Sequence, residues 1–225
     1  MHNNPKPNPP GRAMDVIDIG EALIDVVTTP EGTYEHPGGS PANVAYGLAR
    51  LGVRTRLLTS MGTDRRGDAL EKHLPGAGVT LLPGSRSLER TSTATATIAR
   101  DGSASYAFDI TWDVQPLDPA LTPPRVVHTG SIASFLSPGA GIVKAILQEL
   151  RSECIITYDP NIRPALLGTH AEARFTFEEL VQLTNVVKLS DEDAEWLYPE
   201  KPPEEAATHI LNPNSPYQAG KRAGD

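Results

Sequence analysis

The sequence predicts an α/β fold, with a central sheet flanked by helices. Short β-branched runs alternate with stretches in which apolar residues recur every three or four positions, which is the order typical of α/β sheets. Glycine, or serine followed by proline, stands at several boundaries between these segments, where helices commonly begin or end. Two runs rich in threonine and serine interrupt the series at residues 90–110 and predict a separate hairpin.

Composition limits the class of protein. The chain has 225 residues, a formal net charge of −8 and one cysteine, Cys154. The acidic balance argues against a nucleic-acid partner, which requires a basic surface. A lone cysteine forms neither an internal disulfide nor a cysteine-based metal site. With this cysteine usage we expect a cytoplasmic protein. The chain has no run of about 18 apolar residues, so we expect no membrane partner. Residues 1–13 lack an apolar run and are expected to be a disordered tail.

Residues 16–27 are β-branched and predict the first strand, with a bulge or kink at Gly20-Glu21. Asp25 is a carboxylate within this otherwise apolar run. Buried carboxylates are rare unless they are paired or face a ligand. Asp25 is therefore a candidate ligand-binding residue, and the alternative is that it lies at an exposed end of the strand.

Gly38 and Gly39 precede a predicted helix that runs to about Leu51. Ser40 is expected to be its N-cap, followed by Pro41 at the first helical position. Because the two glycines lack Cβ atoms, a ligand could approach their backbone closely, near the positive end of the helix. Asn43 could direct its amide toward the same place. The alternative is a plain loop before a well-capped helix.

A second strand is predicted over residues 55–62, followed by a helix from about residue 63 to residue 74. The hairpin at 90–110 has Asp101-Gly102 at its turn and alternating small polar residues, which indicate a sheet with one wet face. Within an α/β chain, such a hairpin is either an addition to the sheet edge or a lid over a site.

The α/β alternation resumes with predicted strands at 126–131, 155–158 and 186–189 and helices at 137–150, 176–183 and from 190. Polar residues at the carboxyl ends of such strands commonly bind ligands. Arg163, in the run after the strand at 155–158, could bind a carboxylate or phosphate, or be a solvated surface charge. Ser190 is expected to cap a helix with acidic residues in its first turn, which could alternatively serve a divalent cation. Residues 212–225 lack periodicity and are expected to be a disordered tail.

Taken together, these segments resemble the PfkB-type (ribokinase-like) carbohydrate kinases over about residues 14–210. The first family signature is matched by the run from Gly38 to Gly52 and by Gly62-Thr63-Asp64 with Gly67. The runs at residues 20–25, 159–164 and 187–193 resemble the fructokinase or 2-keto-3-deoxygluconate kinase branch most. The resemblance implies a ribokinase-like central sheet with a small β lid at about 90–112. It also implies that residues 14–211 form the N-terminal two-thirds of a kinase domain.

The resemblance also implies an activity: ATP-dependent phosphorylation, with Mg²⁺, of a sugar or sugar-acid hydroxyl. Asp25, Gly38, Gly39 and Asn43 would hold sugar hydroxyls, and Arg163 would lie near a sugar acid's carboxylate or near phosphate. Ser190 and Asp193 match an Asn-x-x-Glu element near nucleotide phosphate and metal, but here the element is Ser-x-x-Asp. An exposed face of the lid would favour a homodimer.

The family's second signature, Gly-Ala-Gly-Asp, is absent from the chain. In the family it supplies an anion hole and the catalytic base, and the adenine-binding elements lie in the same C-terminal third. Ala223-Gly224-Asp225 is a partial match with no preceding strand. We therefore expect a kinase whose C-terminal part of the fold is missing and which is inactive as it stands. The alternatives are a non-catalytic sugar-binding or regulatory protein and, less favoured because no G-x-G-x-x-G follows the first strand, a generic nucleotide-binding domain.

Overall fold

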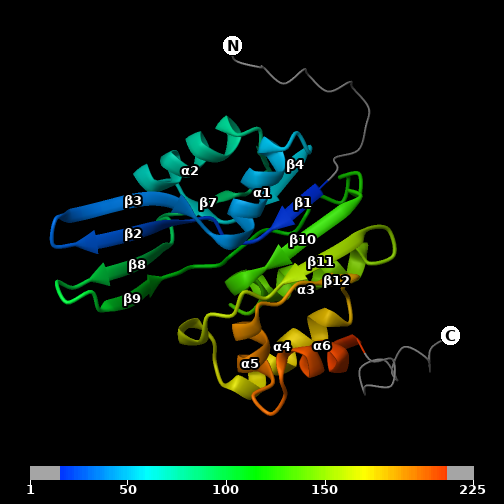
Figure 1. Cartoon of the computed structure of the whole chain (residues 1–225). Coiled ribbons are helices and arrows are strands. Elements are labelled where there is room, and N and C mark those ends of the chain that lie inside the picture. The colour runs from blue at the N-terminus through cyan, green and yellow to red at the C-terminus, as the bar shows by residue number, and fades with distance from the viewer. Residues whose placement is uncertain (1–15, 212–225) are drawn as a thin grey trace.

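The structure, a computed structural model, describes residues 16–211 and shows the α/β order that the sequence predicts (Figure 1). The main sheet consists of β1 (Val16–Ile19), β4 (Thr55–Leu58), β6 (Thr80–Leu81), β10 (Val126–Gly130), β11 (Ile155–Asp159) and β12 (Val186–Val187). Its strands lie in the order β12-β11-β10-β1-β4-β6, and all neighbouring pairs are parallel. The expected tails at 1–13 and 212–225 lie outside the described residues.

Helices cover the sheet in two groups. They are α1 (Ser40–Arg50), α2 (Arg65–Gly76), α3 (Gly139–Leu150), α4 (His170–Val181), α5 (Asp191–Leu197) and α6 (Pro203–Leu211). Helices α1 and α2 share a buried core with Leu57 of β4. Helices α3 and α4 share a second core with Ile17 and Ile156. Because side chains alternate between the faces of a strand, these two cores lie on opposite faces of the sheet.

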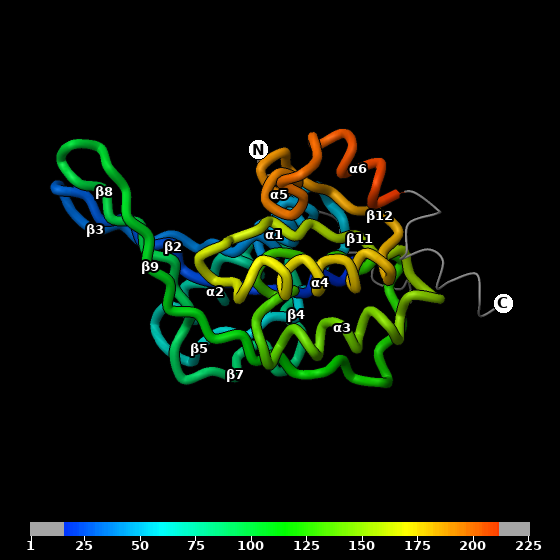
Figure 2. The backbone as a smooth tube through the Cα atoms, turned by 90° about the horizontal axis from the view of Figure 1, so that it is seen from below, coloured from blue at the N-terminus to red at the C-terminus, as the bar shows by residue number. Residues whose placement is uncertain are grey.

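A second sheet projects from this body, as both views show (Figures 1 and 2). It consists of β2 (Leu23–Thr29), β3 (Gly32–Gly38), β8 (Thr93–Ile98) and β9 (Ala104–Asp109), in the order β3-β2-β8-β9. The predicted hairpin is the antiparallel pair β8–β9. It pairs with β2 and not with the edge of the main sheet, so it belongs to a lid-like second sheet. A small third sheet pairs β5 (Met61–Gly62) with β7 (Arg86–Leu88).

The structure corrects the prediction for the first strand and the first helix. Residues 16–27 are not one strand, because β1 ends at Ile19 in the main sheet and β2 begins at Leu23 in the second sheet. The break occurs where Gly20 passes so close to Pro41 that a Cβ would clash. Helix α1 begins at Ser40, and Gly39, with φ of 101°, takes the N-cap position in its place.

Helices in the C-terminal half also differ from the prediction. Helix α4 begins at His170, six residues before the predicted start, because Thr169 and Glu172 form a capping box there. Helix α6 was not predicted at all. Among residues 16–211, no helix is both long and apolar enough to cross a membrane.

Candidate functional site

The site lies where the order of the main sheet reverses. Strands β4 and β6 follow β1 toward one edge of the sheet, whereas β10, β11 and β12 extend toward the other. The carboxyl ends of β1 and β10 therefore diverge at a switch point, where open α/β sheets bind their ligands. Glu21 follows β1 and Ser131 follows β10, so these two side chains lie on either side of this point.

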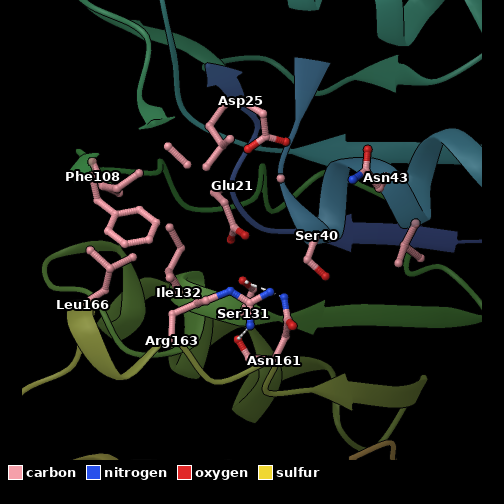
Figure 3. Close-up of a pocket in the computed structure, with 15 residues that line it drawn as sticks. Glu21, Asp25, Ser40, Asn43, Phe108, Ser131, Ile132, Asn161, Arg163 and Leu166 are labelled. Carbon is pink, nitrogen blue, oxygen red and sulfur yellow. Dashed lines mark hydrogen bonds between the residues drawn. The ribbon is translucent and has the colours of Figure 1, made fainter. Parts of the chain in front are cut away.

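A pocket of about 520 Å³ opens at the switch point (Figure 3). Its walls come from the body of the protein, from the second sheet and from the loop after β11. The lining residues are Glu21, Leu23, Asp25, Gly39, Ser40, Asn43, Val44, Ala94, Phe108, Ile110, Ser131, Ile132, Asn161, Arg163 and Leu166. Polar side chains thus converge from several elements under a partly apolar roof, as in pockets for small polar molecules.

Asp25 and the glycine pair form one unit of this wall. Asp25 lies in β2 opposite the end of β3, and its partial burial raises the pKa of its carboxyl, against the charge of His36. A Cβ on Gly38 would clash with the Asp25 carboxylate, and a Cβ on Gly39 would clash with the backbone carbonyl of Glu21. Both positions therefore require glycine for close packing, and Gly39 also requires it for its positive φ.

Asn43 and Arg163 enter the pocket from opposite sides (Figure 3). Asn43 lies in the first turn of α1 and its backbone N–H bonds to the Gly39 carbonyl. Arg163 follows β11, and one of its Nη atoms donates to the backbone carbonyls of Ile162, at 2.9 Å, and Asn161. These bonds hold the guanidinium beside the pocket, and it can still bind an anion.

Glu21 is the most buried acid of the pocket, with 4% of its surface exposed. Burial raises the pKa of Glu21 to about 7, although hydrogen bonds from Ser131 and from the backbone N–H groups of Ala133 and Ser40 favour the ionised form. Its carboxyl can therefore change protonation state near neutral pH, within reach of a bound ligand.

Two non-glycine residues of the pocket have left-handed backbone conformations. They are Ser131, with φ of 55°, and Asn161, with φ of 40°. The amide of Asn161 donates to the hydroxyl of Ser131 at 3.4 Å. Such conformations cost free energy, persist only where the surrounding structure holds them, and recur at functional sites. The turns after β10 and β11 are therefore held in place at the pocket floor.

Ser190 and Asp193 do not line this pocket. Ser190 caps α5, and its hydroxyl accepts the N–H of Asp193 at 3.0 Å. The two carboxylate oxygens of Asp193 accept the N–H groups of Ile162, at 2.7 Å, and of Ser190, at 3.2 Å. In this arrangement Asp193 fixes the loop that carries Arg163.

The residues described here do not make a magnesium site by themselves. Among residues 16–211, no group of three or more His, Cys, Asp or Glu side chains is arranged to hold a metal ion. Both oxygens of Asp193 already accept backbone N–H groups. Mg²⁺ at this end of the sheet would have to be held mainly by water and phosphate, which is how proteins often bind it.

The structure thus brings together most of the sequence-predicted site, and it adds residues that the sequence reasoning missed. Asp25, Gly39, Asn43 and Arg163 line one pocket, and Gly38 abuts Asp25. Among the additions with polar side chains are Glu21, Ser131 and Asn161. Each stands at the carboxyl end of a sheet strand or in the loop after it, and that position was the signal that could have identified them.

Comparisons with known proteins support one family. Residues 11–218 match the model of a family described as "pfkB family carbohydrate kinase". Fructokinase-2 of Solanum habrochaites is 30% identical over 224 residues, which cover 88% of this chain and 66% of that protein. The solved fructokinase of Xylella fastidiosa has a TM-score of 0.77 at 25% identity and covers 88% of this chain and 69% of that one.

A fructokinase double mutant from Vibrio cholerae O395, solved with fructose, ADP and potassium ion bound, gives a TM-score of 0.73 at 25% identity. The match covers 90% of this chain and 68% of that one. The chain spans less than two thirds of the length of such curated relatives. Because the family match extends over nearly the whole chain, the protein belongs to the PfkB family of carbohydrate kinases.

Proposed function

We propose that the pocket at the switch point binds a sugar or sugar acid, as the substrate of a fructokinase-like kinase. The observation that carries this proposal is the convergence of Asp25, Asn43 and Arg163 on one pocket between the body and the second sheet. A carboxylate can accept hydrogen bonds from vicinal hydroxyls, and an amide can both accept and donate them, while glycine at 38 and 39 leaves room for these hydroxyls. The fructose-bound relative supports the sugar class.

Arg163 is the residue we propose to separate a sugar acid from a neutral sugar. Its guanidinium can pair with a carboxylate in a bidentate manner, whereas fructose offers no charge to it. If 2-keto-3-deoxygluconate is the substrate, Arg163→Gln should weaken its binding strongly and leave fructose binding nearly unchanged. If fructose is the substrate, the same substitution should have only a small effect on the binding of either sugar.

For the phosphoryl donor we propose ATP, with Mg²⁺, because a fructokinase relative is solved with ADP. Ser190 and Asp193 would lie toward the nucleotide phosphates, at the end of α5 where its N–H groups favour anions. ATP would supply the transferred phosphoryl group and Mg²⁺ would neutralise its charge. The metal role of Asp193 stays a prediction, since its oxygens are engaged by backbone N–H groups.

We further propose that the 225 residues alone bind sugar but transfer phosphate at a negligible rate. They contain no Gly-Ala-Gly-Asp signature, which in the family carries the base and the anion hole. A positioned base contributes about 10²–10⁴ in rate and one anion-stabilising donor about 10²–10³. A non-catalytic sugar-binding or regulatory role is the second candidate, and it predicts sugar binding that ATP does not alter.

Calorimetry tests the sugar-binding proposal directly. We expect heat on titration with fructose or 2-keto-3-deoxygluconate, and its loss in Asp25→Asn. The matched control is Asp101→Asn at the exposed lid turn, where Asn-Gly is as favourable as Asp-Gly. A folded protein that gives no heat with either sugar would overturn the proposal.

A coupled ADP-release assay, with Fructokinase-2 of Solanum habrochaites as the positive control, separates the kinase from the binding protein. Turnover comparable to the control would refute the proposed inactivity of these 225 residues.

We also propose that the second sheet carries a homodimer interface. Its residues Val27 and Tyr106 line a hollow of about 660 Å³ next to the pocket. Light scattering would detect it as twice the mass of 24.1 kDa.

A further inference from the structure

Trp112 lies where the chain returns from the second sheet to the body of the protein. Strand β9 ends at Asp109, and the next residue, Ile110, lines the pocket. Trp112 is 2% exposed and does not line the pocket, but it belongs to the same buried core as Leu147 of α3. It is therefore the first residue after β9 that packs in the core of the body.

Hydrogen bonds tie the two ends of the β8–β9 hairpin together next to Trp112. The hydroxyl of Ser92, just before β8, accepts the N–H of Thr111 at 3.0 Å and donates to the Thr111 carbonyl at 3.1 Å. Thr91 donates from its N–H and its hydroxyl to the carboxylate of Asp64, which caps α2. Because Thr111 and Trp112 are adjacent, the position of the hairpin and that of Trp112 depend on each other.

On the body side, close contacts hold the indole of Trp112 in one orientation. Its Nε1 donates to the backbone carbonyl of Ala133 at 3.0 Å. The carbonyl of Trp112 accepts the N–H of Gly139 at 3.0 Å, and a Cβ on Gly139 would lie 2.4 Å from the indole Nε1. Glycine at this position lets α3 begin directly against the indole, which leaves the ring little freedom to turn away from Ala133.

Ala133 belongs to the turn that forms one wall of the pocket. The first two residues of this turn, Ser131–Ser134, line the pocket, and Ser131 has a φ of 55°. The N–H of Ala133 donates to the Glu21 carboxylate at 3.4 Å. A backbone strained in this way persists only where its surroundings hold it. Trp112 and Glu21 hold it here, through the carbonyl and the N–H of the same residue.

A buried tryptophan commonly fills a core and finds some acceptor for its indole N–H. Two observations set Trp112 apart from that ordinary role. Its acceptor lies in the strained turn of the pocket wall, and its own backbone follows a residue bound to the root of the hairpin. The facing wall comes from this hairpin, through Ala94 and Phe108. The contacts of Trp112 therefore join the two walls between which a ligand would lie.

We propose that Trp112 is a positioning residue for the sugar pocket. Its indole N–H sets the Ser131–Ser134 turn at a fixed spacing from the β8–β9 hairpin, so that both walls meet the sugar together. Trp112 does not touch the sugar and acts through the turn. This role rests on the proposed sugar binding, so the experiment begins with a parent variant in which binding is measured by itself.

An isosteric replacement isolates the indole N–H. The chain has two tryptophans, and Trp196→Phe, the parent variant, leaves Trp112 as the only one. Biosynthetic incorporation of benzothienylalanine at position 112 then replaces the N–H by sulfur in a ring of nearly the same shape. Fluorotryptophan, incorporated in the same way, keeps the N–H. Trp112→Phe, which keeps an aromatic ring without the N–H, is a second variant in case the sulfur analogue folds poorly.

Calorimetric titration with fructose and with 2-keto-3-deoxygluconate measures the effect, at a temperature where every variant is folded. The dissociation constant of the sugar that binds should rise about 5-fold with benzothienylalanine, the equilibrium factor of one ordinary hydrogen bond. Trp112→Phe should weaken binding at least as much, and fluorotryptophan should restore the affinity of the parent.

Leu147→Ala is the matched control for damage to the core. Leu147 is fully buried in the same core as Trp112, so its truncation leaves a cavity and should lower the melting temperature. Sugar affinity should nevertheless stay within about 2-fold of the parent, because a folded core without this cavity contact still leaves the Trp112–Ala133 bond in place.

Two results would overturn the positioning role alone: benzothienylalanine that binds sugar as tightly as the parent, or Leu147→Ala that weakens binding as much as the loss of the N–H. A folded parent that gives no heat with either sugar would instead overturn the proposed sugar binding, and the role of Trp112 with it.

Discussion

At the residue scale, the shape of the pocket depends on the absence of side chains at Gly38 and Gly39 as well as on the side chains that line it. Gly38 and Gly39 let β3 and α1 pass against Asp25 and the backbone of Glu21 without side chains in between. This close packing sets where the Asp25 carboxylate points, because the space that a Cβ would fill is occupied by its oxygens. The glycine pair is thus part of the pocket's geometry, in addition to allowing a ligand to approach.

Gly38→Ala should disrupt the pocket more than the fold. The new Cβ would overlap the Asp25 carboxylate, so Asp25 must rotate or β3 must shift. We expect sugar affinity to fall at least about 10-fold, with a stability loss of about 1–3 kcal/mol. Gly47→Ala is the control: nothing lies within 4 Å of its Cβ position in α1, and alanine should stabilise the helix by about 0.5–1 kcal/mol. Calorimetry and urea unfolding of both variants check this, and equal affinities would contradict it.

Glu21 should make ligand preference depend on pH. Its pKa is raised to about 7 in the folded protein, so its carboxyl ionises between about pH 6 and pH 8. Ionisation should favour a neutral sugar, whose hydroxyls can donate to the carboxylate, and disfavour a sugar acid by charge repulsion. The ratio of fructose affinity to 2-keto-3-deoxygluconate affinity should therefore rise several-fold across this range. In Glu21→Gln the ratio should stay flat, and a flat ratio in the unmodified protein would count against the prediction.

At the element scale, local patterns predicted several of the elements, but they could not predict which sheet each strand would join. The periodicity of α1 and α3 and the strands predicted at 126–131 and 155–158 rest on local signals, and the structure has elements at these places. The separation of β1 from β2 depends on contact with Pro41, which is distant in sequence. The position of Glu21 opposite Ser131 depends on strand order, which no local pattern encodes.

Helix α5 offers a prediction at this scale. Asp193 accepts N–H groups from both Ser190 and Ile162, so it connects the start of α5 to the loop that carries Arg163. Asp193→Asn replaces one acceptor by a donor that faces an N–H group, and should cost about 1–3 kcal/mol of stability. Asp191→Asn, in the same turn but exposed, should cost no more than about 1 kcal/mol. Urea denaturation measures both, and equal costs would show that Asp193 acts only through the helix dipole.

At the scale of the whole molecule, the sheet carries an unusual ionisable group in its core. Asp18 lies in the middle of β1, fully buried, and among the described residues neither of its oxygens has a hydrogen-bond partner from a side chain or backbone in good geometry. Burial, with a smaller effect of the Glu21 charge, raises the pKa of Asp18 well above its ordinary value. The folded protein therefore holds a proton that the unfolded chain releases above about pH 4.

This difference in proton binding makes the stability of the fold fall as pH rises. The folded state binds more protons than the unfolded state from about pH 4 upward, so the free energy of unfolding decreases until Asp18 also ionises in the folded state. Asp18→Asn is neutral at every pH and lacks this dependence. Its melting temperature relative to that of the unmodified protein should therefore increase steadily from pH 4.5 to pH 8.

Asp101→Asn is the control. Hydrogen bonds from Ser103 lower the pKa of Asp101, so removing its charge should not produce such a rise. Calorimetric melts at four or five pH values would decide the matter, and a constant difference would mean that Asp18 is ionised in the fold.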